Sequence, residues 1–247
     1  MNTLAKFTWV EFKLLARDMI SIPLTLVIPL GLVVAFGLPD SSRRPDPGLG
    51  GLTAIDSVLP TLALTVAVAV LAFTVLPTYL TMYRERRLLR RLATTPVKPS
   101  TVLGAQLLIN IGLVLVSLGL VLVVGMSALG MHLPRSVPWF LVSMVLGLAA
   151  VFSISLLIAS VAKTARGGSG WGFLLFFPSM FFAGVYLPKE AMPDVLARIG
   201  DFTPLGAFRQ TVQDAWLGER PEWLMLGFLA AVAAGCAAAA AKLFRWE

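Results

Sequence analysis

The sequence predicts an all-α integral membrane protein, and three observations indicate this fold class. Apolar residues make up 57% of the 247 residues and charged residues only 13%, which is far from the composition of a soluble globular domain. The mean hydropathy is +0.85. Six apolar stretches approach or exceed the roughly 20 residues that an α-helix needs to cross a bilayer. We therefore expect residues 1–247 to form a single membrane domain.

The six predicted spans are residues 20–38, 57–82, 101–129, 137–162, 171–187 and 223–243. No charged residue lies deep inside them, which disfavours a proton or ion relay. Pro23 and Pro29 in the first span are compatible with a membrane helix, because neighbouring helices can satisfy the freed carbonyls. The fourth span predicts close helix packing, since small residues let helix backbones approach. These small residues are Ser143, Gly147, Ser153, Ser155 and Ser160.

Residues 1–18 precede the first span and predict an amphipathic helix at the membrane surface. From residue 3 onward, apolar side chains recur at helical spacing on one face, and Lys6, Lys13 and Arg17 form a stripe on the other. Such a helix places its apolar face in the acyl boundary and its cations toward anionic headgroups. A plain interfacial anchor and a helix that also contacts a partner are both open at this point.

The distribution of charge predicts the orientation. Six spans place both termini on one side, where thirteen basic residues face four acidic ones, while the other side has seven basic and nine acidic residues. The positive-inside rule puts the richer side, and both termini, in the cytoplasm. We expect a multi-pass protein of a bacterial-type plasma membrane. Topology explains the net charge of +7, so we expect no nucleic-acid partner.

Residues 84–104 (RERRLLRRLATTPVKPSTVLG) carry the one concentrated charge cluster. Basic residues at 84, 87 and 91 share one helical face, with Leu88 and Leu92 close by. The following ATTPVKP must break the helix, because proline lacks the amide hydrogen and restricts the preceding residue. The pattern predicts a short cytoplasmic helix, a turn and re-entry into the membrane. This favours a docking element over a simple stop-transfer loop.

Two further segments flank the fifth span. Residues 165–172 (ARGGSGWG) predict a glycine-rich cytoplasmic turn, which is not a phosphate loop because no Lys-Ser/Thr follows in register. Residues 188–222 predict two helices, at 193–199 and 205–216, as a re-entrant or surface-lying cap on the external side. The aromatic stripe of the fifth span predicts helix packing rather than a ligand surface. It comprises Phe173, Phe176, Phe177, Met180 and Phe181.

The chain has one cysteine, Cys236, and one histidine, His132. A disulfide within the chain needs two cysteines, and we predict no metal site. His132 is expected to be a solvated loop residue. An intramembrane enzyme would need a constellation such as Ser/His, paired Asp or HExxH, so this class is disfavoured.

Two stretches resemble the membrane subunit (permease) of a type 2 ABC transporter, an export family. Residues 83–108 (YRERRLLRRLATTPVKPSTVLGAQLL) resemble its Arg-Glu start, leucine-bearing helix, Ala-Thr-Pro turn and second proline. Residues 176–218 resemble its span end with Gly-Val, an aromatic residue and Leu-Pro, followed by Met-Pro, Pro-Leu, an arginine and a closing glycine. Departures are Arg87, Leu88 and Arg90, where relatives often carry a small residue, Thr and Glu, and Ala183 in place of a frequent Ser. The helix is thus more basic than usual.

The resemblance implies roles for particular residues. A coupling-helix loop at 84–99 would contact a cytoplasmic ATPase through Arg84, Glu85, Arg91, Leu92, Thr95 and Pro96. The interfacial helix would flank the same ATPase through Glu11, Lys13 and Arg17. An external gate in the re-entrant segment would include Gly184, Pro188, Pro193, Pro204 and Arg209. A substrate path would be lined by Thr74, Thr78, Phe177 and Phe181.

The function implied is an ATP-driven exporter in which this chain is the permease and not an enzyme. The sequence has no GxxxxGK[ST] motif, so ATP and Mg²⁺ are expected on a partner ATPase, in two copies, beside a second permease as homodimer or heterodimer. Spans without deep charges favour an amphiphilic or lipid-like substrate, such as a drug, antibiotic or lipid, as in multidrug resistance. A stand-alone channel or secondary transporter and a non-transporting assembly factor are the alternatives.

Overall fold

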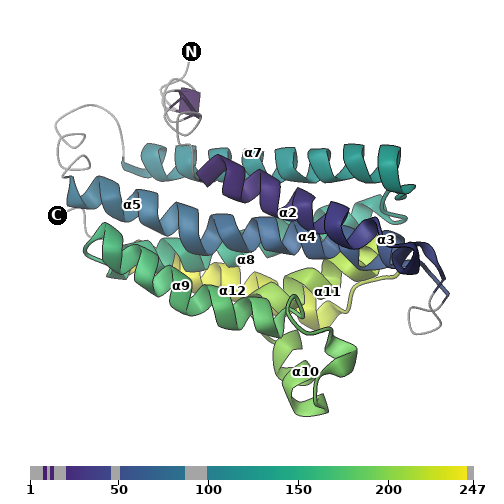
Figure 1. Cartoon of the computed structure of the whole chain (residues 1–247). Helices are drawn as coiled ribbons and strands as arrows, with labels where there is room; N and C mark the ends of the chain where they lie inside the picture. Colours follow the sequence, from purple (N-terminus) through teal and green to yellow (C-terminus); the bar gives the residue numbers. More distant parts are fainter. Residues whose placement is uncertain (1–7, 10–11, 14–20, 46–50, 87–98, 244–247) are drawn as a thin grey trace.

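A computed structural model describes residues 8–9, 12–13, 21–45, 51–86 and 99–243, and the regular elements in these ranges are helices (Figure 1). The first half contains α2 (Ser21–Gly37), η1 (Asp40–Arg43), α3 (Ala54–Ser57), α4 (Leu59–Ala69), η3 (Val70–Val75), α5 (Leu76–Glu85), α7 (Pro99–Val124) and η4 (Gly125–Leu129). The second half contains α8 (Val137–Val161), α9 (Ala165–Phe182), η5 (Lys189–Ala191), α10 (Asp194–Asp201), α11 (Pro204–Leu217) and α12 (Trp223–Leu243).

The long helices cross the bundle in alternating directions between two ends. At the end that we call the Glu85 end, the last residue of α5 contacts the first residue of α9. At the opposite end, which we call the α10 end, α8 and α12 both begin, because the rings of Trp139 and Trp223 lie 5.6 Å apart. The ends of α2 and η4 also meet there, at Gly37 and Leu129 (Figure 1).

Within the part of the chain that the structure describes, four helices are long and apolar enough to cross a membrane: Leu59–Glu85, Thr101–Leu129, Val137–Val161 and Trp223–Leu243. They agree within three residues with four of the predicted spans. Helix α2 has 17 residues, and the 18-residue α9 begins with a polar, glycine-rich turn. Helix α2 nevertheless runs along α4 and α7, and α9 runs along η3 and α5 (Figure 1).

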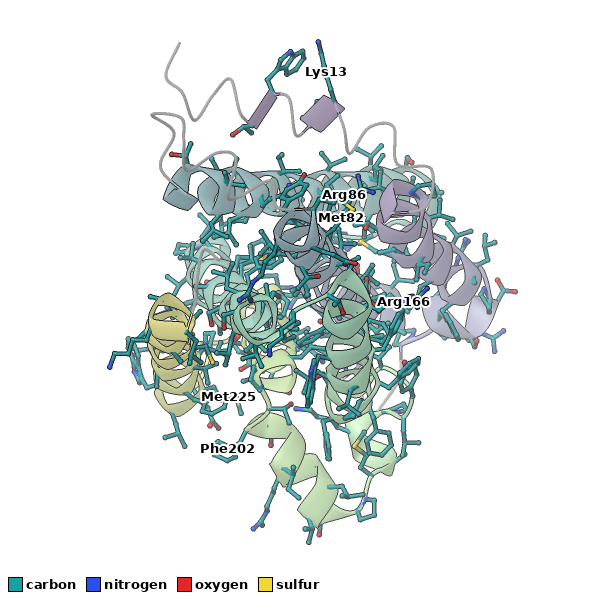
Figure 2. All side chains as sticks on the ribbon, turned by 90° about the vertical axis from the view of Figure 1, so that its left-hand side faces the viewer. Lys13, Met82, Arg86, Arg166, Phe202 and Met225 are labelled. Atoms are coloured by element: carbon teal, nitrogen blue, oxygen red, sulfur yellow. The ribbon has the colours of Figure 1, made fainter. Side chains whose placement is uncertain are left out.

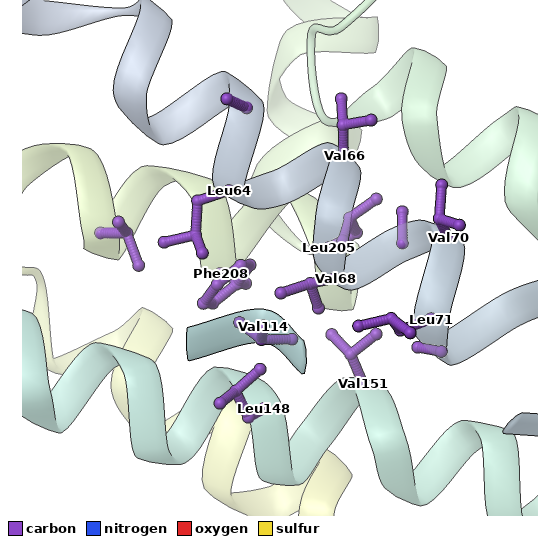
Figure 3. Close-up of a cluster of buried hydrophobic side chains, with 14 of the residues drawn as sticks. Leu64, Val66, Val68, Val70, Leu71, Val114, Leu148, Val151, Leu205 and Phe208 are labelled. Carbon is purple, nitrogen blue, oxygen red and sulfur yellow. The ribbon is translucent and has the colours of Figure 1, made fainter. Parts of the chain in front are cut away.

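The central element is the continuous helix α4–η3–α5, against which α2, α7, α8, α9 and α11 pack. An apolar 18-residue stretch of this helix is 89% buried inside the molecule. The corresponding stretch of α12 is only 22% buried. Figure 3 shows part of this core, in which Leu71 of η3 lies near Val151 of α8 and Phe208 of α11 lies near Val68 of α4. Between membrane helices, packing and hydrogen bonds replace the exclusion of water as the main attraction.

The fourth span packs closely, as its small residues predict. A Cβ atom at Gly147 would lie 2.0 Å from the Phe208 ring, so α11 is seated directly on the α8 backbone. Ser143 Oγ donates to the Thr211 carbonyl at 3.1 Å. Ser155 Oγ donates to the carbonyl of Ala72 in the π-helical turn η3, where the wider turn perturbs the helical ladder.

The prediction of a cytoplasmic turn at 165–172 is wrong, because these residues form the first two turns of α9. The hydroxyl of Thr164 caps the helix by accepting the Gly167 amide at 3.1 Å, which stabilises a helix start here despite the glycines. Helix α9 consequently begins six residues before the predicted start at 171 and ends at Phe182 rather than at 187.

Candidate functional site

Two adjacent side chains at the end of α5 hold the turn between α8 and α9. Arg84 Nη1 donates to the Ser160 and Ala162 carbonyls, at 3.1 and 3.3 Å. Glu85 Oε2 accepts the Ala165 amide at 2.8 Å. Helix C-termini leave carbonyls without partners and carry partial negative charge, and N-termini do the reverse with amides. One residue pair therefore complements the end of one helix and the start of the next. Figure 2 views the molecule from this end.

A buried polar contact joins the helices on either side of residues 87–98. Gln106 Nε2 of α7 donates to the Tyr83 hydroxyl of α5 at 3.2 Å, and Asn110 Nδ2 donates to the Gln106 carbonyl at 2.8 Å. Polar side chains inside membrane spans are costly without such partners. The contact fixes where α5 ends relative to where α7 begins.

Helix α9 lies with its backbone directly on η3 and α5. A Cβ atom at Gly172 would fall 1.8 Å from the Phe73 carbonyl oxygen, and one at Gly168 would fall 2.4 Å from Thr81 Oγ1. The two glycines are four residues apart and so share one helical face. This is the small-xxx-small arrangement that brings membrane helices into close contact.

At the α10 end, α9 terminates against a buried arginine. Gly184 has φ of 75°, and its amide and that of Val185 close the helix by donating to the Phe181 and Met180 carbonyls. A Cβ atom at Gly184 would lie 2.5 Å from Arg209 Nη1, so this position requires glycine. Arg209 is 6% exposed, and its Nη1 donates to the Ala183 carbonyl, which places a positive charge at the helix C-terminus.

A separate polar network joins η5, α10 and α11 in the same region. Lys189 Nζ of η5 bonds Asp201 Oδ1 and also donates to Gln210 Oε1 at 3.3 Å. Gln210 Nε2 donates in turn to Asp214 Oδ1 at 2.9 Å. Burial raises the pKa of the Asp214 carboxyl to about 6, and Glu219 adds to that effect. These groups line a cavity of about 470 Å³ together with Arg220, Glu222 and Met225.

The residues predicted for an external gate fall within this region. Gly184 and Arg209 are in contact, as described above. Pro188 and Pro193 immediately precede η5 and α10, and Pro204 is the first residue of α11, where the fixed φ of proline favours a helix start. The predicted helices at 193–199 and 205–216 are confirmed as α10 and α11. Helix α11 packs into the bundle against α8, α4 and α12, whereas α10 projects from it (Figure 1).

The residues predicted for a substrate path lie on η3, α5 and α9. The hydroxyls of Thr74 and Thr78 donate to carbonyls one turn earlier in their own helix, both at 2.6 Å. Phe177 is 56% exposed and stacks on Phe173 at 6.3 Å, while Phe181 is half-buried and contacts Phe182. The aromatic stripe of α9 is thus only partly a packing surface within this chain.

Several predicted contact residues lie outside the described ranges: Glu11, Arg17, Arg91, Leu92, Thr95 and Pro96. Lys13 is described, is exposed, and places Nζ 5.4 Å from the Trp9 ring centre. His132 is exposed as predicted and lies 3.0 Å from an Asp56 oxygen.

Sequence reasoning missed the partners of Arg84 and Glu85 and the close contact of α9 with η3. Two signals were present in the sequence. Thr164 before Ala-Arg-Gly-Gly is a helix N-cap pattern, and Gly168 with Gly172 forms a GxxxG spacing. Thr164 directly precedes the predicted turn at 165–172, and both glycines lie inside it, so neither signal contributes to a predicted helix.

The fold and site together define a multi-pass helical membrane domain in which α9 connects two contact regions. The sequence matches the family of ABC-2 type transporters over residues 4–215. The chain therefore belongs to this family, and it is the membrane domain of a transporter. No curated protein matches the chain.

Proposed function

We propose that this chain is the permease subunit of an exporter driven by a separate ATPase. The observation that carries the proposal is the family match over residues 4–215. Two ATPase copies would bind ATP and Mg²⁺, and a second permease, identical or related, would complete the pore. Closure of the ATPases on ATP would move the cytoplasmic segments of both permeases between two membrane states.

Residues 84–99 are the segment that we assign to ATPase contact, and its contact residues are Arg84, Glu85, Arg91, Leu92, Thr95 and Pro96. Support comes from the basic, leucine-bearing pattern of this segment and from the contacts at both of its borders. Arg84 and Glu85 hold the α8–α9 turn on one side, and Gln106 bonds Tyr83 on the other. Movement of the segment would therefore act on α5, α7 and α9 together. The interfacial residues Glu11, Lys13 and Arg17 would flank the same ATPase.

Helices α2 and α9 would be the first and fifth of six spans, with the Glu85 end and both termini in the cytoplasm of the plasma membrane. The alternating helix directions support this arrangement. The basic residues Arg86, Lys163 and Arg166, which border the Glu85 end, support the orientation. Residues 188–222 would then form an external re-entrant gate around Arg209.

The transported substrate would be amphiphilic or lipid-like and would pass between the permeases near Thr74, Thr78, Phe177 and Phe181. Support comes from spans without deep charges and from the exposed apolar face of α9, on which Trp171, Leu174 and Phe177 are each more than half exposed. An apolar face of this kind suits acyl chains or apolar ring systems better than a hydrated ion.

Co-purification from native membranes tests the proposal. The tagged chain is extracted in mild detergent, and its partners are identified by mass spectrometry. We expect a stoichiometric protein with a GxxxxGK[ST] motif, lost in Arg91→Glu and in Leu92→Asp but retained in Arg198→Glu, a matched charge reversal on exposed α10. A wild-type preparation without such a partner would contradict the exporter and favour a stand-alone channel or an assembly factor. Retention in both coupling variants would contradict the assigned contact segment.

A further inference from the structure

Helix α9 is held at both termini by charges that complement its dipole. The Glu85 carboxylate accepts the amide of the first residue, Ala165, and the Arg209 guanidinium donates to the carbonyl of Ala183, directly after the last. Eighteen residues of α-helix separate these contacts by about 27 Å. One helix therefore connects a side chain at the Glu85 end with a side chain at the α10 end.

Between its termini, α9 has little freedom to move independently of η3 and α5. The backbone-to-backbone contact of Gly172 with the Phe73 carbonyl offers no side chain that could absorb a displacement. One turn nearer to Glu85, Gly168 makes a second close contact, with the Thr81 side chain and the Pro77 carbonyl. Pro178 removes one amide from the helical ladder, but the amides of Ala183, Gly184 and Val185 keep the final turn closed.

Beyond α9, the contact continues into the region of the proposed gate. Arg209 belongs to α11, whose next residue, Gln210, accepts from Lys189. Lys189 also pairs with Asp201 at the end of α10. A second contact brings Gly200 of α10 against the Phe182 carbonyl, where a Cβ atom would lie at 2.5 Å. A shift of the α9 terminus must therefore be followed by α10 and α11.

We propose that α9 transmits displacements of the Arg84–Glu85 pair to the α10–α11 region, with Glu85 and Arg209 as the positioning residues at its two termini. The inference rests on the proposed function only for the source of the displacement, which would be the ATPase. The mechanical link itself is a property of this chain and can be tested without any partner.

The test measures the modification rate of a buried thiol at one end after a change at the other. In a Cys236→Ala background, Ala183→Cys places a thiol at a fully buried position beside Arg209. We expect Glu85→Gln to raise the rate of maleimide modification at 183 at least about fivefold, the lower range of coupling between distant sites. Glu85→Asp, which keeps the charge, should restore part of the protection. Arg86→Gln, an exposed neighbour of Glu85, should leave the rate unchanged.

A second buried thiol separates transmission from general loosening of the fold. Ala150→Cys lies on α8 and is also fully buried, so global destabilisation would raise its rate as well. An increase confined to position 183 supports the link through α9. Equal rates in wild type and Glu85→Gln, or equal increases at 150 and 183, would overturn it. If Ala183→Cys does not fold, Met192→Cys, buried at the end of η5, provides the same measurement. Because no ATPase is present, these outcomes are independent of the co-purification result.

Discussion

The two termini of α9 are held by opposite charges in different surroundings. Glu85 is an exposed carboxylate at the N-terminus, whereas Arg209 is a guanidinium with only 6% of its surface exposed at the C-terminus. Exposed charges at helix termini contribute about 0.3–1 kcal/mol, while hydrogen bonds to charged groups contribute about 1.5–3 kcal/mol. The difference indicates that the α10 end anchors the helix and that the Glu85 end can be adjusted at small energetic cost.

The middle of α9 is held differently again, by backbone contact. We expect Gly172→Ala to have the largest effect on stability, lowering the free energy of unfolding by about 3 kcal/mol, because its Cβ atom must push the Phe73 carbonyl away. Gly170→Ala on the same helix has open space around its Cβ atom and should be neutral or slightly stabilising. Thermal or denaturant unfolding in detergent checks both. Similar unfolding free energies for the two variants would show that the close contact at Gly172 does not hold the middle of α9.

The second-largest loss of stability should follow from a change at Arg209, the buried anchor of the α10 end. Arg209→Met keeps much of the side-chain volume but deprives the buried Ala183 carbonyl of its donor, so we expect a loss of about 2 kcal/mol. Arg198→Met changes an exposed arginine on α10 and should stay within about 0.5 kcal/mol of wild type. Unfolding measured for this pair tests whether the α10 end is the stronger attachment. Equal stabilities would place the anchor elsewhere.

Substitutions at the Glu85 end should lower the unfolding free energy less than the change at Arg209. Thr164→Ala removes the hydroxyl that caps α9, and we expect a loss of about 1 kcal/mol in unfolding free energy. Thr164→Ser retains the hydroxyl and should remain near wild type. A larger loss for Thr164→Ala than for Arg209→Met would reverse the order of the two ends.

The pH dependence of stability provides the smallest and most local test. Burial raises the pKa of Asp214 to about 6 from its ordinary value of 3.8, so the folded protein binds the proton more tightly than the unfolded chain. Stability contributed by this group is present below about pH 4 and is lost as the pH rises to about 6. In Asp214→Asn, unfolding followed between pH 4 and 7 should show less of this decline. An unchanged pH profile would show that Asp214 is solvated in the folded state.

The helical fold was largely predictable, because long apolar stretches have few alternatives in a membrane. The spans at 101–129 and 223–243 match to the residue. One boundary marked by turn chemistry was also predicted, since α11 begins at Pro204. Gly218, which ends α11 with φ of 90°, was noted only as part of the family resemblance. The start of α9 was mispredicted because glycines and an arginine resemble a loop, while their tight contacts with α5 come from distant sequence.

The candidate site was predictable only in part. The pattern around Arg84 and Glu85 identified an important segment. Their hydrogen-bond partners Ser160, Ala162 and Ala165, however, lie about 80 residues away in sequence. No local periodicity encodes such a pairing. Arg209 and Gly184 were selected for the external region by resemblance, yet their contact through Ala183 follows only from the three-dimensional arrangement.

The most direct test of the account is the reciprocal of the thiol measurement. Coupling between two sites acts in both directions, so a change at Arg209 must also alter the Glu85 end. Hydrogen–deuterium exchange of the amides at 163–168 is measured in wild type, Arg209→Met and Arg198→Met. A link through α9 predicts faster exchange in Arg209→Met and no change in Arg198→Met. Exchange in Arg209→Met equal to that of wild type would contradict a link through α9.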